Sequence, residues 1–322
     1  MIPRLSIFLL HIPDGFLSVP VALLGWLLAI FFIALALRQT RQQFDERRIP
    51  LMGVMAAFIF AAQAINFPVL GGTSGHLLGG ALAAIVLGPW AGVLVMAAVI
   101  GLQGLLFQDG GLLVMGWNIM NMGVLTVFTG AAVYRIARRW LTDDRTGLII
   151  GGAAGAWLSV MAAAVATSLE LAASGTSPLN IVLPAMLAVH ALIGIGEAVI
   201  TVGALLLIYS TRPDLLRQGA TAAGQKSSVW VGAGLVIALA MAFFSFTASG
   251  DPDGLERVAE DQGFLGTALD PLYNALPDYT IPFVENEAVS GVIAMLIGVL
   301  VVFGLVLLVG QLIRRVRSGR TQ

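Results

Sequence analysis

The residues best suited to chemistry in this sequence are its histidines, of which there are only three. His11 begins the segment HIPDGFLS, and His76 ends the glycine-rich segment GGTSGH; each segment borders a long apolar run. Imidazole is the commonest side-chain ligand of transition metals, and the sequence has no cysteine to supply a thiolate. The two segments therefore predict a site for nickel, cobalt, copper or zinc, held by nitrogen and oxygen ligands, rather than an iron–sulfur cluster.

The composition is that of an integral membrane protein. Hydrophobic residues make up 58% of the chain and charged residues 11%, with a mean hydropathy of +0.93. The formal net charge of −1 argues against nucleic acid as a partner, because nothing would neutralise a run of phosphates. No Gly-x-x-x-x-Gly-Lys-Ser/Thr segment occurs, so we do not expect this chain to bind ATP through a P-loop.

The apolar runs predict an all-α, polytopic membrane helix bundle, with about seven helical segments in a core and two more in a C-terminal module. The runs cover residues 15–37, 51–66, 77–88, 89–106, 117–134, 147–172, 183–209, 229–248 and 289–313. A crossing needs about 20 residues, so 51–66 is marginal and 77–88 is too short to span alone. Pro89 is expected to separate two helices, because proline removes a backbone donor and clashes with the preceding turn.

The basic residues predict the orientation in the membrane. Fifteen of the 17 lysines and arginines fall in four patches, which are Arg38, Arg41, Arg47 and Arg48; Arg135, Arg138, Arg139 and Arg145; Arg212, Arg217 and Lys226; and Arg314, Arg315, Arg317 and Arg320. The positive-inside rule places these patches in the cytoplasm, which puts the N-terminus outside the cell and the C-terminus inside. His11 and His76 are then expected to meet on the extracytoplasmic side.

Four motifs occur in a fixed order along the first two thirds of the chain. They are HIPDGFLS at 11–18, GGTSGHLLGGALAAIVLGPW at 71–90, WNIMNMG at 117–123 and HALIGIGEAVIT at 190–201. Together they resemble the cobalt/nickel-binding substrate component (CbiM/NikM type) of energy-coupling-factor transporters.

A fifth segment, PDGLE at 252–256, resembles the PDGLE accessory module that is often encoded beside or fused to the nickel-type component. We therefore expect a metal-binding membrane core over 1–217, a linker over 218–228 and a PDGLE module over 229–322. The module would contain two transmembrane helices joined by an acidic outer loop at 249–288.

The resemblance implies a specific mode of metal binding. In the family, the histidine of HIPDG follows the initiator Met, so that the amine, the amide nitrogen and the imidazole chelate the ion. The histidine of GGTSGH completes a square of nitrogens, which suits nickel(II) or copper(II). Carried onto this sequence, the imidazoles are those of His11 and His76.

This chain departs from the family pattern because Leu10, rather than an initiator Met, precedes His11. We hypothesise that Leu10 is the true start, encoded by UUG or CUG, and that residues 1–9 are not part of the mature chain. Leu10 would then supply the N-terminal nitrogen. The alternative is a genuine extension that is trimmed, or that replaces the amine with another donor.

Five further polar residues are expected to support the site. Asn118 and Asn121 are predicted to orient the metal ligands by hydrogen bonding to the ring nitrogens or to the backbone that carries them. The alternative is that they form structural hydrogen bonds between helices. Asp14 is expected to fix its Pro-Asp-Gly turn through its carboxylate. His190 and Glu197 share a helix face two turns apart and are predicted to serve coupling or structure rather than metal ligation.

Two acidic features are expected to be solvated. One is Glu170, near the outer end of its helix. The other is the loop at 249–288, which holds nine acidic residues against Arg257 alone.

The function implied by the resemblance is substrate capture for an ATP-driven importer of nickel(II) or cobalt(II), with nickel favoured by the PDGLE segment and the chelate. The metal would be the transported substrate, and no organic cofactor is expected. The chain is predicted to be a transporter subunit and not an enzyme. Its partners would be a transmembrane coupling protein and two cytoplasmic ATPases, which hydrolyse the ATP. This chain and the coupling protein would lie in the prokaryotic cell (inner) membrane, and the ATPases would bind at its cytoplasmic face.

Two other functions are considered. An intramembrane metalloenzyme is disfavoured because no His-Glu-x-x-His segment occurs. A proton-coupled secondary metal transporter would use His190 and Glu197 as a relay, but the sequence lacks the paired inverted repeats typical of such transporters.

Overall fold

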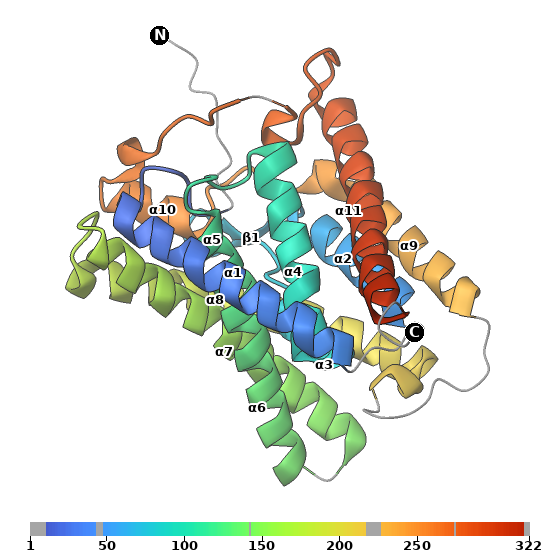
Figure 1. The fold of residues 1–322 in the computed structure, drawn as a ribbon. Coiled ribbons are helices and arrows are strands. Elements are labelled where there is room, and N and C mark those ends of the chain that lie inside the picture. The colour runs from blue at the N-terminus through green and yellow to red at the C-terminus, as the bar shows by residue number, and fades with distance from the viewer. Residues whose placement is uncertain (1–10, 43–47, 142, 217–226, 274, 319–322) are drawn as a thin grey trace.

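The computed structural model describes residues 11–42, 48–141, 143–216, 227–273 and 275–318 (Figure 1). The helices of the first part are α1 (Val19–Gln42), α2 (Ile49–Gln63), α3 (Gly80–Leu87), α4 (Pro89–Leu102), α5 (Met115–Asn118), α6 (Thr126–Trp140), α7 (Asp144–Ala173) and α8 (Leu179–Thr211). Those of the second part are α9 (Ser227–Phe243), α10 (Gly254–Asp261) and α11 (Glu287–Ser318). The predicted all-α class is confirmed.

Two π-helical segments extend the helices close to the histidines. Gln103–Phe107 continues α4, and Ile119–Leu125 joins α5 to α6 in one continuous rod. π-helical turns are rare and are found frequently at functional sites.

Seven of the described helical segments are long and apolar enough to cross a membrane. They are Val19–Gln42, Pro89–Phe107, Met115–Trp140, Asp144–Ala173, Leu179–Thr211, Val229–Thr247 and Glu287–Arg315. The chain is therefore an integral membrane protein with several transmembrane helices. α3 has 8 residues and falls short of a full crossing, as the sequence predicts. α2, whose apolar run is marginal in the sequence, has 15 residues and also falls short.

The predicted break at Pro89 is confirmed. α3 ends at Leu87 and is capped by Gly88, whose φ of +85° is a conformation that glycine adopts at little steric cost. Pro89 then opens α4, where its missing N–H has no helical partner to lose.

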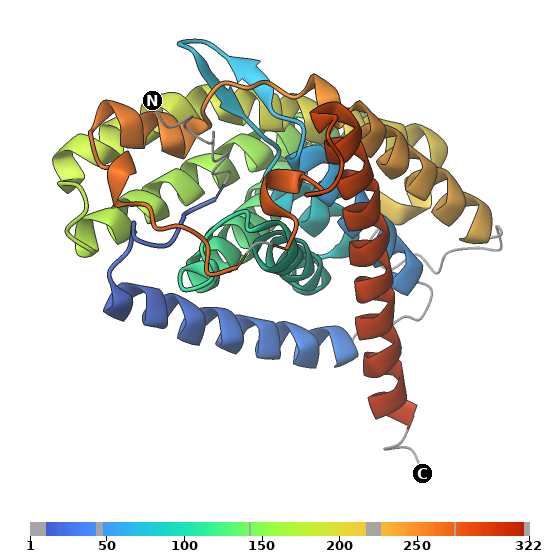
Figure 2. The same ribbon diagram turned by 90° about the horizontal axis from the view of Figure 1, so that it is seen from above.

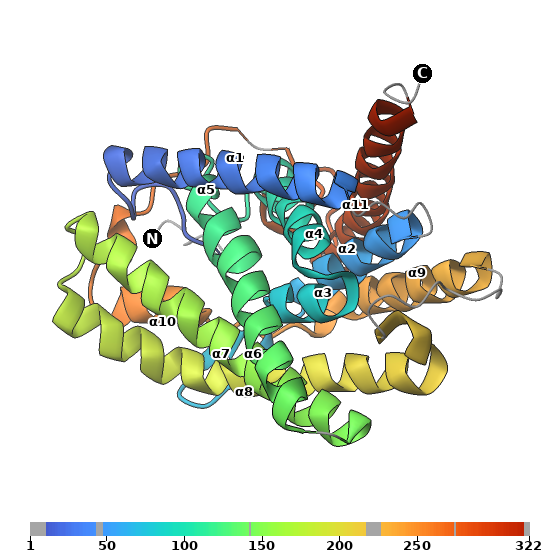
Figure 3. The ribbon, with the colours of Figure 1, turned by 60° about the horizontal axis from the view of Figure 1, so that its bottom comes forward.

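The helices form two groups around α4 (Figures 1 and 3). On one side α7 runs along α8 and α6 packs on α7; on the other side α2 packs against α9 and α11. A short antiparallel hairpin, β1 (Phe67–Val69) and β2 (Thr73–Gly75), lies beside α8 and stands out in the view from above (Figure 2). The hairpin is an addition to the expected helices, and it carries the chain into His76.

The buried apolar side chains form two clusters. The larger lies among α2, α3, α4, α6 and α11. The smaller joins the N-terminal segment to α7, α8 and α10, with the rings of Phe16 and Phe264 in an edge-on contact at 5.2 Å between centroids. The acidic loop therefore folds onto the site region through Leu255, Val258 and Ala259, which are buried. The expectation of a purely solvated loop is wrong for this part.

Candidate metal-binding site

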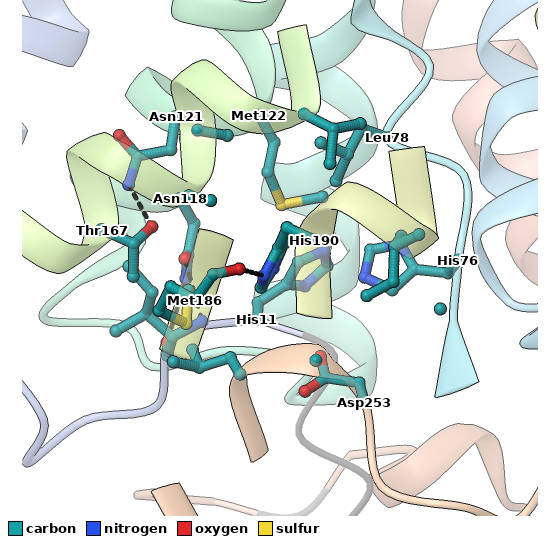
Figure 4. Close-up of a pocket in the computed structure, with 18 residues that line it drawn as sticks. His11, His76, Leu78, Asn118, Asn121, Met122, Thr167, Met186, His190 and Asp253 are labelled. Carbon is teal, nitrogen blue, oxygen red and sulfur yellow. Dashed lines mark hydrogen bonds between the residues drawn. The ribbon is translucent and has the colours of Figure 1, made fainter. Parts of the chain in front are cut away.

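All three histidines line one cavity of about 70 Å³ (Figure 4). Its walls come from the N-terminal segment, β2, the π-helical segment after α5, α7, α8 and α10. This volume corresponds to only a few water molecules, so the cavity suits an ion better than an organic ligand.

The imidazoles of His11 and His76 are 2% and 7% exposed, and their centroids lie 5.8 Å apart with the ring planes at 85°. A metal–imidazole bond of about 2.0–2.1 Å holds each ring centre roughly 3 Å from the ion. The separation of the two rings therefore fits one shared metal. Nε2 of His11 is buried and has no hydrogen-bond partner among the described residues.

Asp109 fixes the other nitrogen of His11. Nδ1 of His11 lies 3.0 Å from the Asp109 carbonyl oxygen, with hydrogen-bond geometry, and 2.9 Å from the carboxylate Oδ1, a charge contact. Burial alone would lower the pKa of His11, but the Asp109 carboxylate and its hydrogen bonding hold that pKa above its usual value. With the proton of a neutral imidazole on Nδ1, the lone pair that a metal needs is on Nε2.

Asp109 was not singled out from the sequence, although it stands in the Asp-Gly-Gly turn before α5. Burial alone would raise the pKa of its carboxyl group, but the contacts with His11 and Tyr279 lower it. The carboxylate is thus a stable counter-charge for His11.

Asn118 fastens the N-terminal segment to α5, and Asp14 fastens it to the loop before α5. The side chain of Asn118 accepts from the Ile12 N–H at 3.1 Å and donates to the Ile12 carbonyl at 3.0 Å. Asp14 accepts through Oδ1 from the N–H groups of Leu113 and Val114, at 2.9 and 3.2 Å. Both side chains therefore hold the backbone in place by hydrogen bonds, and Asn118 does so at Ile12, the residue next to His11.

Asn121 lines the cavity, but the bonds described for its side chain lead away from the ring nitrogens. It donates to Thr167 Oγ1 at 3.2 Å and to Glu170 Oε2 at 2.9 Å, which ties the π-helical segment to α7. Glu170 is only 5% exposed, so the expectation that it is solvated is wrong. Its helix extends past it to Ala173 and packs against α8, which keeps water away from this turn.

Glu197 is fully buried and binds the backbone just beyond His76. Its two carboxylate oxygens accept from the N–H groups of Leu78, at 2.5 Å, and Gly79, at 2.9 Å. His190 lines the cavity from the same helix, and its Nδ1 lies 2.8 Å from the Met186 carbonyl. The two residues share α8 but have different partners.

The PDGLE segment forms one wall of the cavity. The Pro252 carbonyl accepts from the Ser74 N–H at 2.8 Å and from Thr73 Oγ1 at 3.0 Å, so this segment pairs with β2. A Cβ on Gly254 would lie 2.6 Å from Ile193 Cδ1, so a larger residue could not approach α8 as closely. Sequence reasoning used PDGLE only as a family signature and missed this contact.

Asp253 is the buried carboxyl group of that wall. Its Oδ1 accepts from the Glu256 N–H at 2.7 Å and so caps α10. Burial raises the pKa of Asp253 to about 7. Among the described residues, no group of three or more His, Asp or Glu side chains is arranged to hold a metal.

Comparison with known proteins assigns the chain to a family. Residues 11–215 match the family described as the cobalt uptake substrate-specific transmembrane region, CbiM, and residues 227–315 match the PDGLE domain. The chain belongs to the CbiM family and carries a C-terminal PDGLE domain, which confirms the resemblance of its motifs.

Relatives named as fused nickel transport proteins match this chain along nearly its whole length. The putative fused nickel transport protein NikMN of Archaeoglobus fulgidus is 36% identical over 299 residues, which cover 92% of this chain and 96% of the relative. The fused nickel transport protein NikMN of Rhodobacter capsulatus is 29% identical and covers 96% of this chain. A crystal structure of a truncated transition metal transporter matches 62% of this chain and 97% of its own, with 33% identity and a TM-score of 0.55.

Proposed function

We propose that this protein captures nickel(II) or cobalt(II) at the outer face of a prokaryotic cell membrane, as the substrate-binding subunit of an ATP-driven importer. The observation that carries this proposal is the pair of buried imidazoles, His11 and His76, whose centroids lie 5.8 Å apart in one small cavity. The relatives named as nickel transport proteins, and the family described as a cobalt uptake region, support the choice of metal as transported substrate.

The imidazole donors in this proposal are a ring nitrogen of His11 and a ring nitrogen of His76. In the structure Asp109 holds Nδ1 of His11, and Nε2 has no hydrogen-bond partner among the described residues. A chelate through the His11 amide nitrogen would use Nδ1 instead, since only that nitrogen closes a small ring with its own backbone. That chelate would form only after the imidazole had left Asp109.

A nitrogen of residue 10 is our candidate for a further donor. Leu10, like residues 1–9, lies outside the described residues, so this remains a prediction. It is supported by the absence of a third His, Asp or Glu ligand in the described part of the chain. N-terminal sequencing of the purified protein is expected to read from residue 10 onward, which would expose an amine next to His11. A mature chain that begins at Met1 would contradict a start at Leu10.

The orientation and division of the chain are part of the same proposal. The N-terminus and the cavity would face outward and the C-terminus inward, in keeping with the four basic patches. A core over 1–217 and a module over 229–322 would be joined by the linker 218–228, of which 218–226 lies outside the described residues. The core would contact the coupling protein, and the two ATPases would bind from the cytoplasm.

Nickel uptake in cells that produce this chain with its coupling protein and ATPases is expected to stop when the P-loop lysine of the ATPases is replaced. The reason is that the sequence of this chain has no P-loop of its own. Uptake of radioactive nickel should also survive collapse of the proton gradient while ATP is maintained. Uptake that persists with inactive ATPases and disappears with the proton gradient would favour the secondary transporter instead.

A further inference from the structure

Two membrane-spanning helices enclose a groove at the opposite end of α1 from His11. The C-terminal end of α1 lies beside the C-terminal part of α11 (Figures 1 and 2). The groove between them has a volume of about 860 Å³, and its walls come from residues 34–42 of α1 and 309–313 of α11. None of its lining residues belongs to the metal cavity. The groove is therefore a separate place where a molecule could bind.

The lining of the groove changes from apolar to basic near the ends of both helices. On α1 the apolar lining ends at Leu37 and is followed by Arg38 and Arg41. On α11 it ends at Ile313, and two arginines come next in the sequence. A spanning helix leaves the hydrocarbon of the bilayer where its apolar run gives way to charged residues. The groove therefore crosses the boundary between the acyl chains and the headgroups, whichever face of the membrane it lies on.

The polar end of the groove carries positive charge without a counter-charge. Its described lining contains no Asp or Glu, and the ion pairs found among the described residues involve neither Arg38 nor Arg41. The two arginines are three residues apart in a helix, so they share a face. Guanidinium groups bind phosphate oxygens through paired N–H donors. An anionic group at the level of the headgroups would therefore complement this end.

We propose that the groove binds one anionic phospholipid, with its phosphate on Arg38 and Arg41 and an acyl chain along the apolar walls of α1 and α11. Basic pockets between transmembrane helices are sites of this kind. The apolar walls favour a lipid over a soluble phosphate, because only a lipid covers them. The bound lipid would join a helix of the metal-binding core to a helix of the PDGLE module. The inference depends neither on the metal site nor on the orientation of the chain.

The chain offers a matched control for the charge. Arg135 and Arg139 are exposed, one turn apart, near the end of another spanning helix, and they do not line the groove. The double variants Arg38→Gln/Arg41→Gln and Arg135→Gln/Arg139→Gln lower the net charge by the same amount. A difference between them therefore reports the groove and not a general attraction of the protein for anionic lipid.

The affinity is measured by native mass spectrometry of the full-length protein in detergent, freed of lipid and titrated with phosphatidylglycerol. Each basic residue near an anionic headgroup contributes about fivefold in affinity, so Arg38→Gln/Arg41→Gln is expected to bind roughly 25-fold more weakly. The control variant is expected to bind as wild type does. Equal losses in the two variants, unchanged binding by the groove variant, or no binding by wild type would overturn the inference.

Two other ligands identify what the groove recognises. Phosphatidylcholine with the same acyl chains has no net charge and is expected to bind wild type more weakly than phosphatidylglycerol. Glycerol phosphate has the phosphate without the chains and is expected not to displace the lipid. Equal binding of the two lipids, or displacement by glycerol phosphate, would contradict a site for an anionic phospholipid.

The apolar walls are tested without a change of charge. Ala34 lines the groove and is exposed, so Ala34→Trp is expected to occupy the space of the acyl chain and to weaken lipid binding. Ala132→Trp, at an exposed position of α6, is expected to leave it unchanged. Thermal unfolding identifies any variant that has lost its fold, and the charge variants then decide the result.

The coupling protein is the alternative occupant of the groove. If it bound there, the Arg38→Gln/Arg41→Gln and Ala34→Trp proteins would fail to co-purify with the coupling protein, while their affinity for phosphatidylglycerol would equal that of wild type. That result would overturn the lipid site and assign the groove to the coupling protein.

Discussion

His76→Ala and His11→Ala are each expected to purify without bound nickel or cobalt. Each change removes one of two imidazoles that meet at 5.8 Å, so the loss should exceed the roughly 10–100-fold that follows removal of an outer partner. The metal content of wild type and variants, measured by mass spectrometry after purification from cells grown with nickel, gives the result directly. Stoichiometric metal retained in both variants would mean that the site lies elsewhere.

His190→Ala is the control for this experiment. His190 lines the same cavity and has the same side chain, but the resemblance of the motifs places the metal ligands at His11 and His76 and not at His190. We expect the His190→Ala protein to retain its metal. If all three variants lost metal together, a general collapse of the cavity would explain the result better than loss of a ligand. Thermal unfolding of the same samples would detect such a collapse.

The positions of the helices were predictable from the sequence because each depends on local features. The length of an apolar run determines whether a helix can span, and Gly88-Pro89 determines where α3 ends and α4 begins. The pairing of His11 with His76 was predicted from two motifs and from the distribution of charge. It did not require knowledge of the contacts between them.

The contacts around the histidines were not predictable, because they join segments far apart in the chain. Asp109 and His11 are 98 residues apart, and Ser74 and Asp251 are 177 residues apart. No periodicity or spacing rule reports such pairs. A buried acid such as Glu170 also looks like a solvated one in sequence, since its burial depends on the packing of α7 against α8 and on Asn121.

Glu197→Ala is expected to destabilise the protein by roughly 2–6 kcal/mol, because it leaves one buried and one partly buried N–H group without an acceptor, at about 1–3 kcal/mol each. Those groups belong to Leu78 and Gly79, which follow His76 directly and lead into α3. Glu197→Gln keeps one carbonyl oxygen, so its loss should be intermediate. Unfolding in detergent, followed by heat or denaturant, measures both effects.

An exposed carboxylate provides the comparison for Glu197. Glu260→Ala, on the solvent side of α10, should unfold as wild type does. Wild-type stability of Glu197→Ala would mean that the two N–H groups find other acceptors and that the carboxylate is not structural. A coupling role for Glu197 would be favoured if Glu197→Gln kept its stability and its bound nickel but lost nickel uptake. The carboxylate would then act on a step after capture rather than on the backbone that holds His76.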